Sequence, residues 1–166
     1  MRMGTIALNA VILMALVIAH TLLADLVALG GITPDLPLVA VVFIALRYGQ
    51  IPGTLAGFGT GLAFDLLSSG DGVMGLSALA KTVAGFLAGY FYSETKAQQL
   101  LGGYEFVILV GATALVHNIL YFVVLLQGTD IGWNLAILRY GIPSALYTAA
   151  AALIPMFIVS RRSSVA

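Results

Sequence analysis

An acidic and a basic side chain, Asp65 and Lys81, lie in stretches of the sequence that are otherwise apolar and rich in small residues. Each belongs to a series spaced four residues apart, so each series lines one face of a helix. The two series are Gly53, Gly57, Gly61 and Asp65, and Ser77, Lys81, Gly85 and Gly89. An unpaired charge inside a bilayer costs at least about 2.5–3.5 kcal/mol. We therefore expect Asp65 and Lys81 to form an ion pair or a hydrogen-bonded polar core, with a ligand or proton pathway and a partner contact as the alternatives.

The glycines in these two series predict close contact between helices. Lipid gives helices no hydrophobic reason to associate, so van der Waals contact at small residues has to hold them together. The residues expected to make such contacts are Gly53, Gly57, Gly61, Gly85 and Gly89. The contacts are either internal packing, which we favour, or contacts with a partner protein.

Several further polar residues fall inside apolar stretches, but their spacing does not match that of a metal site or a catalytic group. They are Asn9, His20, Asp25, His117, Asn118 and Arg139. Two isolated histidines in a chain without cysteine do not predict a metal site. We expect hydrogen-bonding roles for these side chains, and neither a cofactor nor an enzymatic activity.

The composition predicts an integral membrane protein. Of the 166 residues, 61% are hydrophobic and only 8% are charged, and the mean hydropathy is +1.07, beyond what a soluble domain of this length can bury. Seven basic and seven acidic residues give a formal charge of zero, which argues against a nucleic-acid partner. We expect a single all-α, polytopic membrane domain over residues 1–166.

Six apolar segments bounded by turn residues are predicted to be transmembrane helices. They cover 5–29, 34–47, 52–69, 73–92, 104–127 and 134–159. The second holds about 12 strongly apolar residues, or about 18 Å of helix, against a hydrocarbon core of about 30 Å. We expect this short helix to begin below the outer lipid surface, with Asp35 as its cap. Pro143 and Pro155 are expected to kink the sixth segment.

The basic residues outside the apolar segments predict the orientation. Five of the seven lie at the termini or in the loops on the same side, and none lies in the opposite loops. The five are Arg2, Arg47, Lys96, Arg161 and Arg162. The positive-inside rule therefore predicts cytoplasmic termini, with Asp35, Asp71 and Asp130 marking the external loops.

Three runs between residues 33 and 89 have a distinctive order. They are Thr33-Pro34-Asp35-Leu36 with Ala45-Leu46-Arg47-Tyr48-Gly49; the glycine-rich run 57–70, which ends Asp65-Leu66-Leu67-Ser68-Ser69-Gly70; and the run from Gly75-Leu76-Ser77-Ala78-Leu79 to Gly85-Phe86-Leu87-Ala88-Gly89. In order and spacing they resemble the second, third and fourth spans of the rod shape-determining protein MreD family. Asp35 and Asp65 match that pattern, whereas Lys81 is not part of it. Elsewhere only the length and the number of spans agree.

This resemblance implies a non-enzymatic component of the bacterial elongation machinery in the cytoplasmic (inner) membrane. The resemblance implies that the chain binds the bitopic protein MreC and helps to organise lateral peptidoglycan synthesis with the RodA and PBP2 synthases and MreB filaments. The mechanism expected from the resemblance is contact between transmembrane helices, with an MreC-like protein as the direct partner.

A substrate-binding subunit of an energy-coupling-factor vitamin importer is the alternative. Such subunits are similar in size, in span number and in their glycine-rich third span. They need a ligand pocket near the outer surface. The N-terminus of the short second helix could contribute to one, because its free N–H groups and positive dipole end favour a ligand there.

Overall fold

The computed structural model describes residues 3–67, 73–130 and 132–163. In this part of the chain the regular secondary structure is helical apart from one isolated bridge between Leu29 and Ile32. Asp71, Arg2, the side chain of Arg162 and the motif positions 68–70 lie outside the described residues. The helices are α1 (Met3–Leu23), α2 (Leu36–Tyr48), α3 (Gln50–Leu67), α4 (Leu76–Gly89), α5 (Ala97–Gly102), α6 (Tyr104–Leu125), α7 (Trp133–Ala136), α8 (Ile142–Ala151) and α9 (Leu153–Ser163). A 3-10 turn (Ala24–Leu26) follows α1, and a π-helical turn (Ile137–Gly141) joins α7 to α8.

The all-helical, apolar character predicted from the sequence is confirmed. Three stretches in the described part are long and apolar enough to cross a membrane, and two shorter apolar helices accompany them. The long stretches are Met3–Leu26, Tyr104–Leu125 and Trp133–Arg161, and the short helices are α2 and α4. α3 is 18 residues long, but its glycines, Gln50 and Asp65 lower its hydropathy. The number of six membrane crossings stays a prediction.

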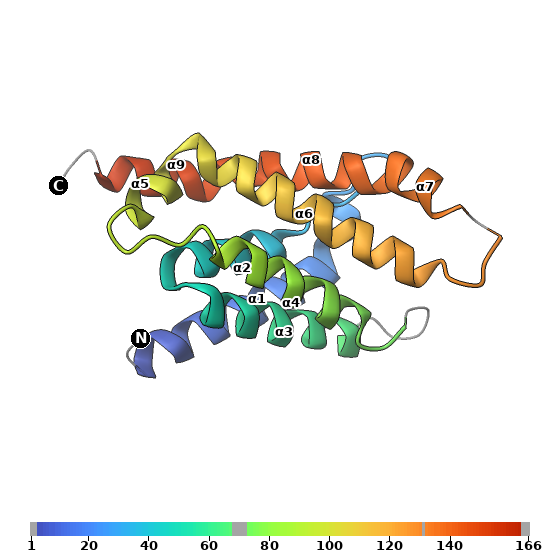
Figure 1. Ribbon diagram of the computed structural model, residues 1–166, viewed down its shortest axis with the longest axis horizontal. Helices are drawn as coiled ribbons and strands as arrows, with labels where there is room; N and C mark the ends of the chain where they lie inside the picture. Colours follow the sequence, from blue (N-terminus) through green and yellow to red (C-terminus); the bar gives the residue numbers. More distant parts are fainter. Residues whose placement is uncertain (1–2, 68–72, 131, 164–166) are drawn as a thin grey trace.

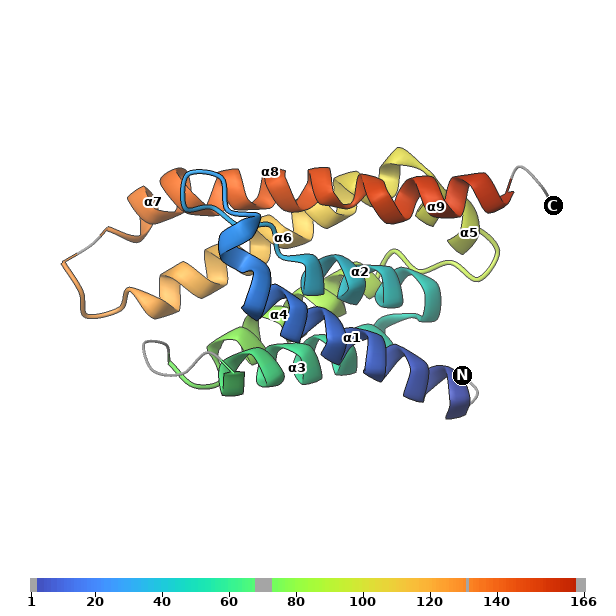
Figure 2. The ribbon, with the colours of Figure 1, turned by 180° about the vertical axis from the view of Figure 1, so that it is seen from behind.

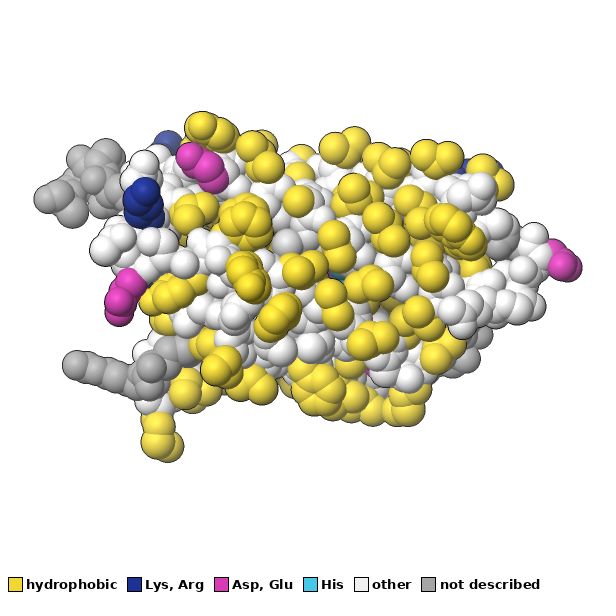
Figure 3. All heavy atoms as spheres, viewed as in Figure 1, with side chains coloured by type: hydrophobic (Ala, Val, Ile, Leu, Met, Phe, Trp, Pro, Cys, Tyr) yellow, Lys and Arg dark blue, Asp and Glu magenta, His cyan; other side chains and the backbone are white. Residues whose placement is uncertain are grey.

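The helices run along one common direction, with α1 crossing the others at a slant (Figures 1 and 2). α3 and α4 form the most closely packed pair, and α6 packs against α4 and α8. α1 begins and α9 ends at the same end of the bundle (Figure 1). Hydrophobic side chains cover the middle of the face seen in Figure 3, and charged side chains lie at its two ends. This distribution suits a protein surrounded by lipid at its middle.

The short helix α2 occupies the centre of the bundle. It contacts α1, α3, α4, α5, α6 and α8, and most of its side chains are buried, including Leu38, Val41, Val42 and Leu46. Its 13 residues give a length of about 20 Å, which is less than a bilayer core. Its neighbours α1, α3 and α6 are longer, and its first residues are held against α8 by a hydrogen bond, so its N-terminal end lies inside the protein.

The two prolines of the last segment interrupt its hydrogen bonding. Ahead of Pro143, the N–H of Ile142 donates to the carbonyl of Ile137 in the π-helical turn, and a second break lies at Ala152, three residues before Pro155. Proline cannot donate to the preceding turn, which accounts for a change of register at both places. α8 and α9 nevertheless continue in one direction (Figure 2). The prolines therefore interrupt the hydrogen bonding as expected, but the expected bend between these helices is not seen.

Candidate functional site

Asp35 caps the buried N-terminus of α2. Its Oδ1 accepts a hydrogen bond from the N–H of Leu38 at 2.9 Å, while Pro37 in the first turn has no N–H to satisfy. The N–H of Asp35 itself donates to Thr148 Oγ1 of α8 at 2.9 Å. This contact, 113 residues away in sequence, ties the start of α2 to the last helices.

Lys81 of α4 forms an ion pair with Asp35. Its Nζ donates to Asp35 Oδ2, and only 3% of the Lys81 side chain is exposed, against 18% for Asp35. The same Nζ lies 5.7 Å from the centroid of the Phe64 ring, within range of a cation–π interaction. The expected pairing of Lys81 with Asp65 is therefore wrong. The carboxylate that satisfies Lys81 comes from the buried start of α2.

Asp65 caps α4 from the end of α3. Its two carboxylate oxygens accept hydrogen bonds from the N–H groups of Ser77 at 3.1 Å and Ala78 at 3.0 Å. These N–H groups belong to the first turn of α4, which has no partners for them within the helix. A negative charge there also interacts favourably with the helix dipole. Asp65 thus belongs to a hydrogen-bonded polar contact between two helices.

The ion pair lies well inside the bundle. At about 1.5 Å per residue, Lys81 is roughly 7.5 Å along α4 from its start at Leu76, and His117 is roughly 12 Å along α6 from its end at Leu125. Asp35 and His117 line the same cavity. The start of α2 therefore lies level with interior turns of α4 and α6, and not with their ends.

A polar cavity of about 160 Å³ lies beside the ion pair. Its walls come from α1, α3, α6, α8 and the segment before α2, and its side chains include His20, Asp35, Phe64, His117, Asn118 and Tyr121. His117 is 7% exposed. Its Nε2 and the Nδ1 of His20 are buried atoms without a hydrogen-bond partner among the described residues. Buried polar atoms are normally satisfied, so these two nitrogens mark the cavity as a candidate binding site.

The five glycines that the sequence singled out line the contact between α3 and its neighbours. A methyl group on Gly57 would collide with the backbone of Lys81, and one on Gly61 with the backbone of Ser77 and Ala78. Gly53 faces Gly85, where an added methyl group would lie 2.7 Å from the Gly85 carbonyl oxygen, and Gly89 faces Gln50. These contacts are internal, so this face of α3 is occupied by α4.

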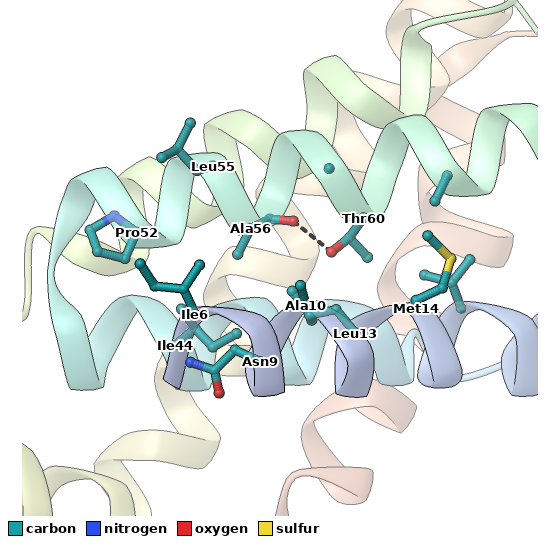
Figure 4. A pocket seen from close by; sticks show the side chains of 13 residues that line it. Ile6, Asn9, Ala10, Leu13, Met14, Ile44, Pro52, Leu55, Ala56 and Thr60 are labelled. Atoms are coloured by element: carbon teal, nitrogen blue, oxygen red, sulfur yellow. Dashed lines mark hydrogen bonds between the residues drawn. The ribbon is translucent and has the colours of Figure 1, made fainter. Parts of the chain in front are cut away.

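A second cavity, an apolar groove of about 330 Å³, separates α1 from α3 (Figure 4). We call it the α1–α3 groove. Its lining includes Asn9, Ala10, Ile44, Ala56, Gly59 and Ala63. In α1 only Leu13 and Val17 are buried, so much of this helix has no intramolecular cover. Asn9 Nδ2 is a buried donor to which no described residue offers an acceptor.

The remaining predicted site residues lie elsewhere. Asp25 is exposed in the 3-10 turn after α1. Arg139 is exposed in the π-helical turn, with its guanidinium carbon 5.6 Å from the centroid of the Tyr140 ring. Asn118 lies beside His117 and donates from Nδ2 to the carbonyl of Gly141 at 2.8 Å. Across residues 3–67, 73–130 and 132–163, no three acidic, histidine or cysteine side chains come together as metal ligands.

Comparisons with known proteins do not assign this chain to a family. No protein-family model, curated protein or solved structure matches it. The features of the described chain that bear on function are therefore the two cavities and the contacts around Asp35. Sequence reasoning missed the ion-pair partner of Lys81, the role of Thr148 and the α1–α3 groove. One feature of the sequence could have pointed to the contact between Asp35 and Thr148, because both are polar residues next to strongly apolar runs.

Proposed function

We propose that this chain is a non-enzymatic component of the rod-shape and cell-wall elongation complex in the bacterial inner membrane. In this proposal it crosses the membrane six times, keeps both termini in the cytoplasm and acts by contact with the transmembrane helix of an MreC-like bitopic protein. RodA and PBP2 synthases and MreB filaments are further members of the same assembly. The observation that carries the proposal is the α1–α3 groove with the unsatisfied amide of Asn9.

The groove favours a helix over a lipid chain. It lies between two apolar helices, so its occupant comes from within the bilayer (Figure 4). Its small residues Ala56, Gly59 and Ala63 let a second backbone approach closely, as in other helix contacts in membranes. A lipid tail offers no acceptor to Asn9 Nδ2, whereas a helix can offer a side-chain oxygen or a backbone carbonyl.

One glycine in α3 and one in α1 separate partner binding from folding. A methyl group added at Gly59 meets no atom within 4 Å, so Gly59→Leu leaves the fold intact and fills the groove. Gly4→Leu in α1 is the matched control, because Gly4 is equally open and does not line the groove.

The test is affinity capture of a co-expressed MreC-like protein in mild detergent. We expect the wild-type chain and Gly4→Leu to retain the partner, and Gly59→Leu to lose at least about nine-tenths of it, as expected when a close helix contact is blocked. Failure of the wild-type chain to retain the partner contradicts the proposed function. Equal capture by the Gly59→Leu variant contradicts the groove as the contact site.

The vitamin-importer alternative is supported by one different observation. The N-terminus of α2 lies inside the protein and borders the polar cavity through Asp35, which is a common arrangement in transporters. A vitamin that co-purifies with the chain, identified by mass spectrometry, would favour this function. Capture of an MreC-like protein without a bound vitamin would favour the scaffold.

A further inference from the structure

The hydrogen bonds around Asn118 fix the proton position on neutral His117. Asn118 Nδ2 donates to the Gly141 carbonyl at 2.8 Å, so its other terminal atom, Oδ1, faces His117 Nδ1 at 3.2 Å. An amide oxygen only accepts hydrogen bonds, so Nδ1 carries the hydrogen and Nε2 carries a lone pair. The carbonyl that orients Asn118 belongs to the π-helical turn, a feature often found at functional sites.

That lone pair has no donor among the described residues. His117 is 93% buried, its Nε2 has no partner in the part of the chain that the structure describes, and its ring lines the polar cavity. The cavity volume of about 160 Å³ equals the space of roughly five water molecules at about 30 Å³ each. A molecule bound in this space could donate the hydrogen bond that the buried acceptor His117 Nε2 lacks.

The walls of the cavity restrict the chemistry of that molecule. Rings from His20, Phe64, Tyr121 and His117 line part of the space, which favours a flat ring that can stack on them or meet them edge to face. The charges nearby cancel, because Asp35 and Lys81 are paired with each other. A charged ligand would have no counter-ion there, so an uncharged one is favoured.

We propose that the polar cavity binds a small, uncharged, single-ring molecule that donates an O–H or N–H hydrogen bond to His117 Nε2. This site goes beyond the docking of a partner helix. It is built from different residues than the α1–α3 groove, which shares none of its side chains.

Phenol and anisole provide a matched pair of probes. Both carry one aromatic ring, but only phenol has a donor. Binding of their fluorinated forms to the purified full chain in nanodiscs is measured by 19F NMR titration. Partition into lipid favours anisole, since it is the less polar of the two. We expect phenol to bind saturably and at least about fivefold more tightly than anisole, the preference expected when a buried acceptor gains its partner.

Two further measurements make the result specific to His117. In wild-type protein with 15N-labelled histidine, phenol is expected to shift the Nε2 resonance of His117 and anisole is not. His117→Phe keeps a ring and removes the acceptor, so it should abolish the preference for phenol, while Gly59→Leu should preserve it. Absence of saturable phenol binding, equal or tighter anisole binding, or an unmoved Nε2 resonance would each overturn the proposal. Because Gly59→Leu blocks only the groove, failure of the partner test and failure of this one are distinguishable.

Discussion

Gly57 of α3 lies directly against the backbone carbonyl of Lys81 in α4, the residue whose side chain reaches Asp35. The same position of α4 therefore serves two contacts. Its backbone packs on a glycine of α3, and its ammonium group satisfies the cap of α2. Close approach of α3 thus sets where Lys81 lies relative to the start of α2.

Gly57→Leu should destabilise the contact between α3 and α4. The added side chain meets backbone atoms of Lys81 and Thr82, which cannot move aside without moving a helix, so we expect a loss of about 1–3 kcal/mol in the free energy of unfolding. Unfolding in detergent, followed by circular dichroism, measures it. Gly59→Leu, two residues away in open space, is expected to change the free energy by less than about 0.5 kcal/mol. Equal stability of the two variants would contradict this packing.

Lys81→Met should be strongly destabilising because it leaves the Asp35 carboxylate without its counter-ion. Removal of one partner from a buried pair costs about 3–5 kcal/mol. Asp35→Asn removes the charge and keeps a good helix cap, so the double variant Asp35→Asn/Lys81→Met should be more stable than Lys81→Met alone. Chemical unfolding of the four proteins gives the coupling energy, expected to be at least about 1 kcal/mol.

The same cycle with Asp65 tests the corrected pairing. Asp65→Asn combined with Lys81→Met should show a coupling below about 0.5 kcal/mol, because Asp65 bonds the backbone of α4 and not the lysine side chain. A larger coupling for Asp65 than for Asp35 would restore the pairing expected from the sequence.

Asp65→Asn should loosen the start of α4. Asparagine keeps one acceptor oxygen and turns a donor toward the other backbone N–H, so one of the two hydrogen bonds is lost at a cost of about 1–3 kcal/mol. Hydrogen–deuterium exchange should become faster at Ser77 and Ala78. Asp25→Asn, at an exposed position, is the control and should leave exchange in α4 unchanged. Unaltered exchange in the Asp65 variant would show that the cap contributes little.

Thr148→Val should weaken the attachment of α2 to α8. Valine has a similar shape but cannot accept the hydrogen bond from the Asp35 N–H, which then lies buried without a partner at a cost of about 1–3 kcal/mol. The measurement is the unfolding midpoint in detergent, with Thr129→Val at an exposed position as the control. If both variants unfold at the wild-type midpoint, Thr148 is not an anchor of α2.

Much of the local structure could be predicted from residues close in sequence. The bounds of α2 follow from three residues. Asp35 is its N-cap, Pro37 lies in its first turn and Gly49 ends it. The close contact of α3 with α4 follows from glycines at intervals of four, since both helices are joined by a short connection and have to lie side by side. The spacing of small residues and the residues that begin or end a helix act over a few positions, so their effects can be predicted without a structure.

The partner of Lys81 could not be found in this way. Asp65 is 16 positions from Lys81 and Asp35 is 46, so proximity in sequence favoured the wrong carboxylate. The choice depends on how deeply the short helix α2 is set into the bundle, which its own residues do not specify. The α1–α3 groove is equally hidden, because it depends on the slant at which α1 crosses its neighbours (Figure 2).

The sequence by itself determined that the chain is helical, apolar and glycine-packed, because hydropathy and residue spacing act along a single helix. Only the tertiary structure decided which charges meet and which polar atoms stay without a partner. Those outcomes depend on the relative depth and tilt of helices that are distant in sequence. The energies that set depth and tilt are shared among many weak contacts, so no single motif records them.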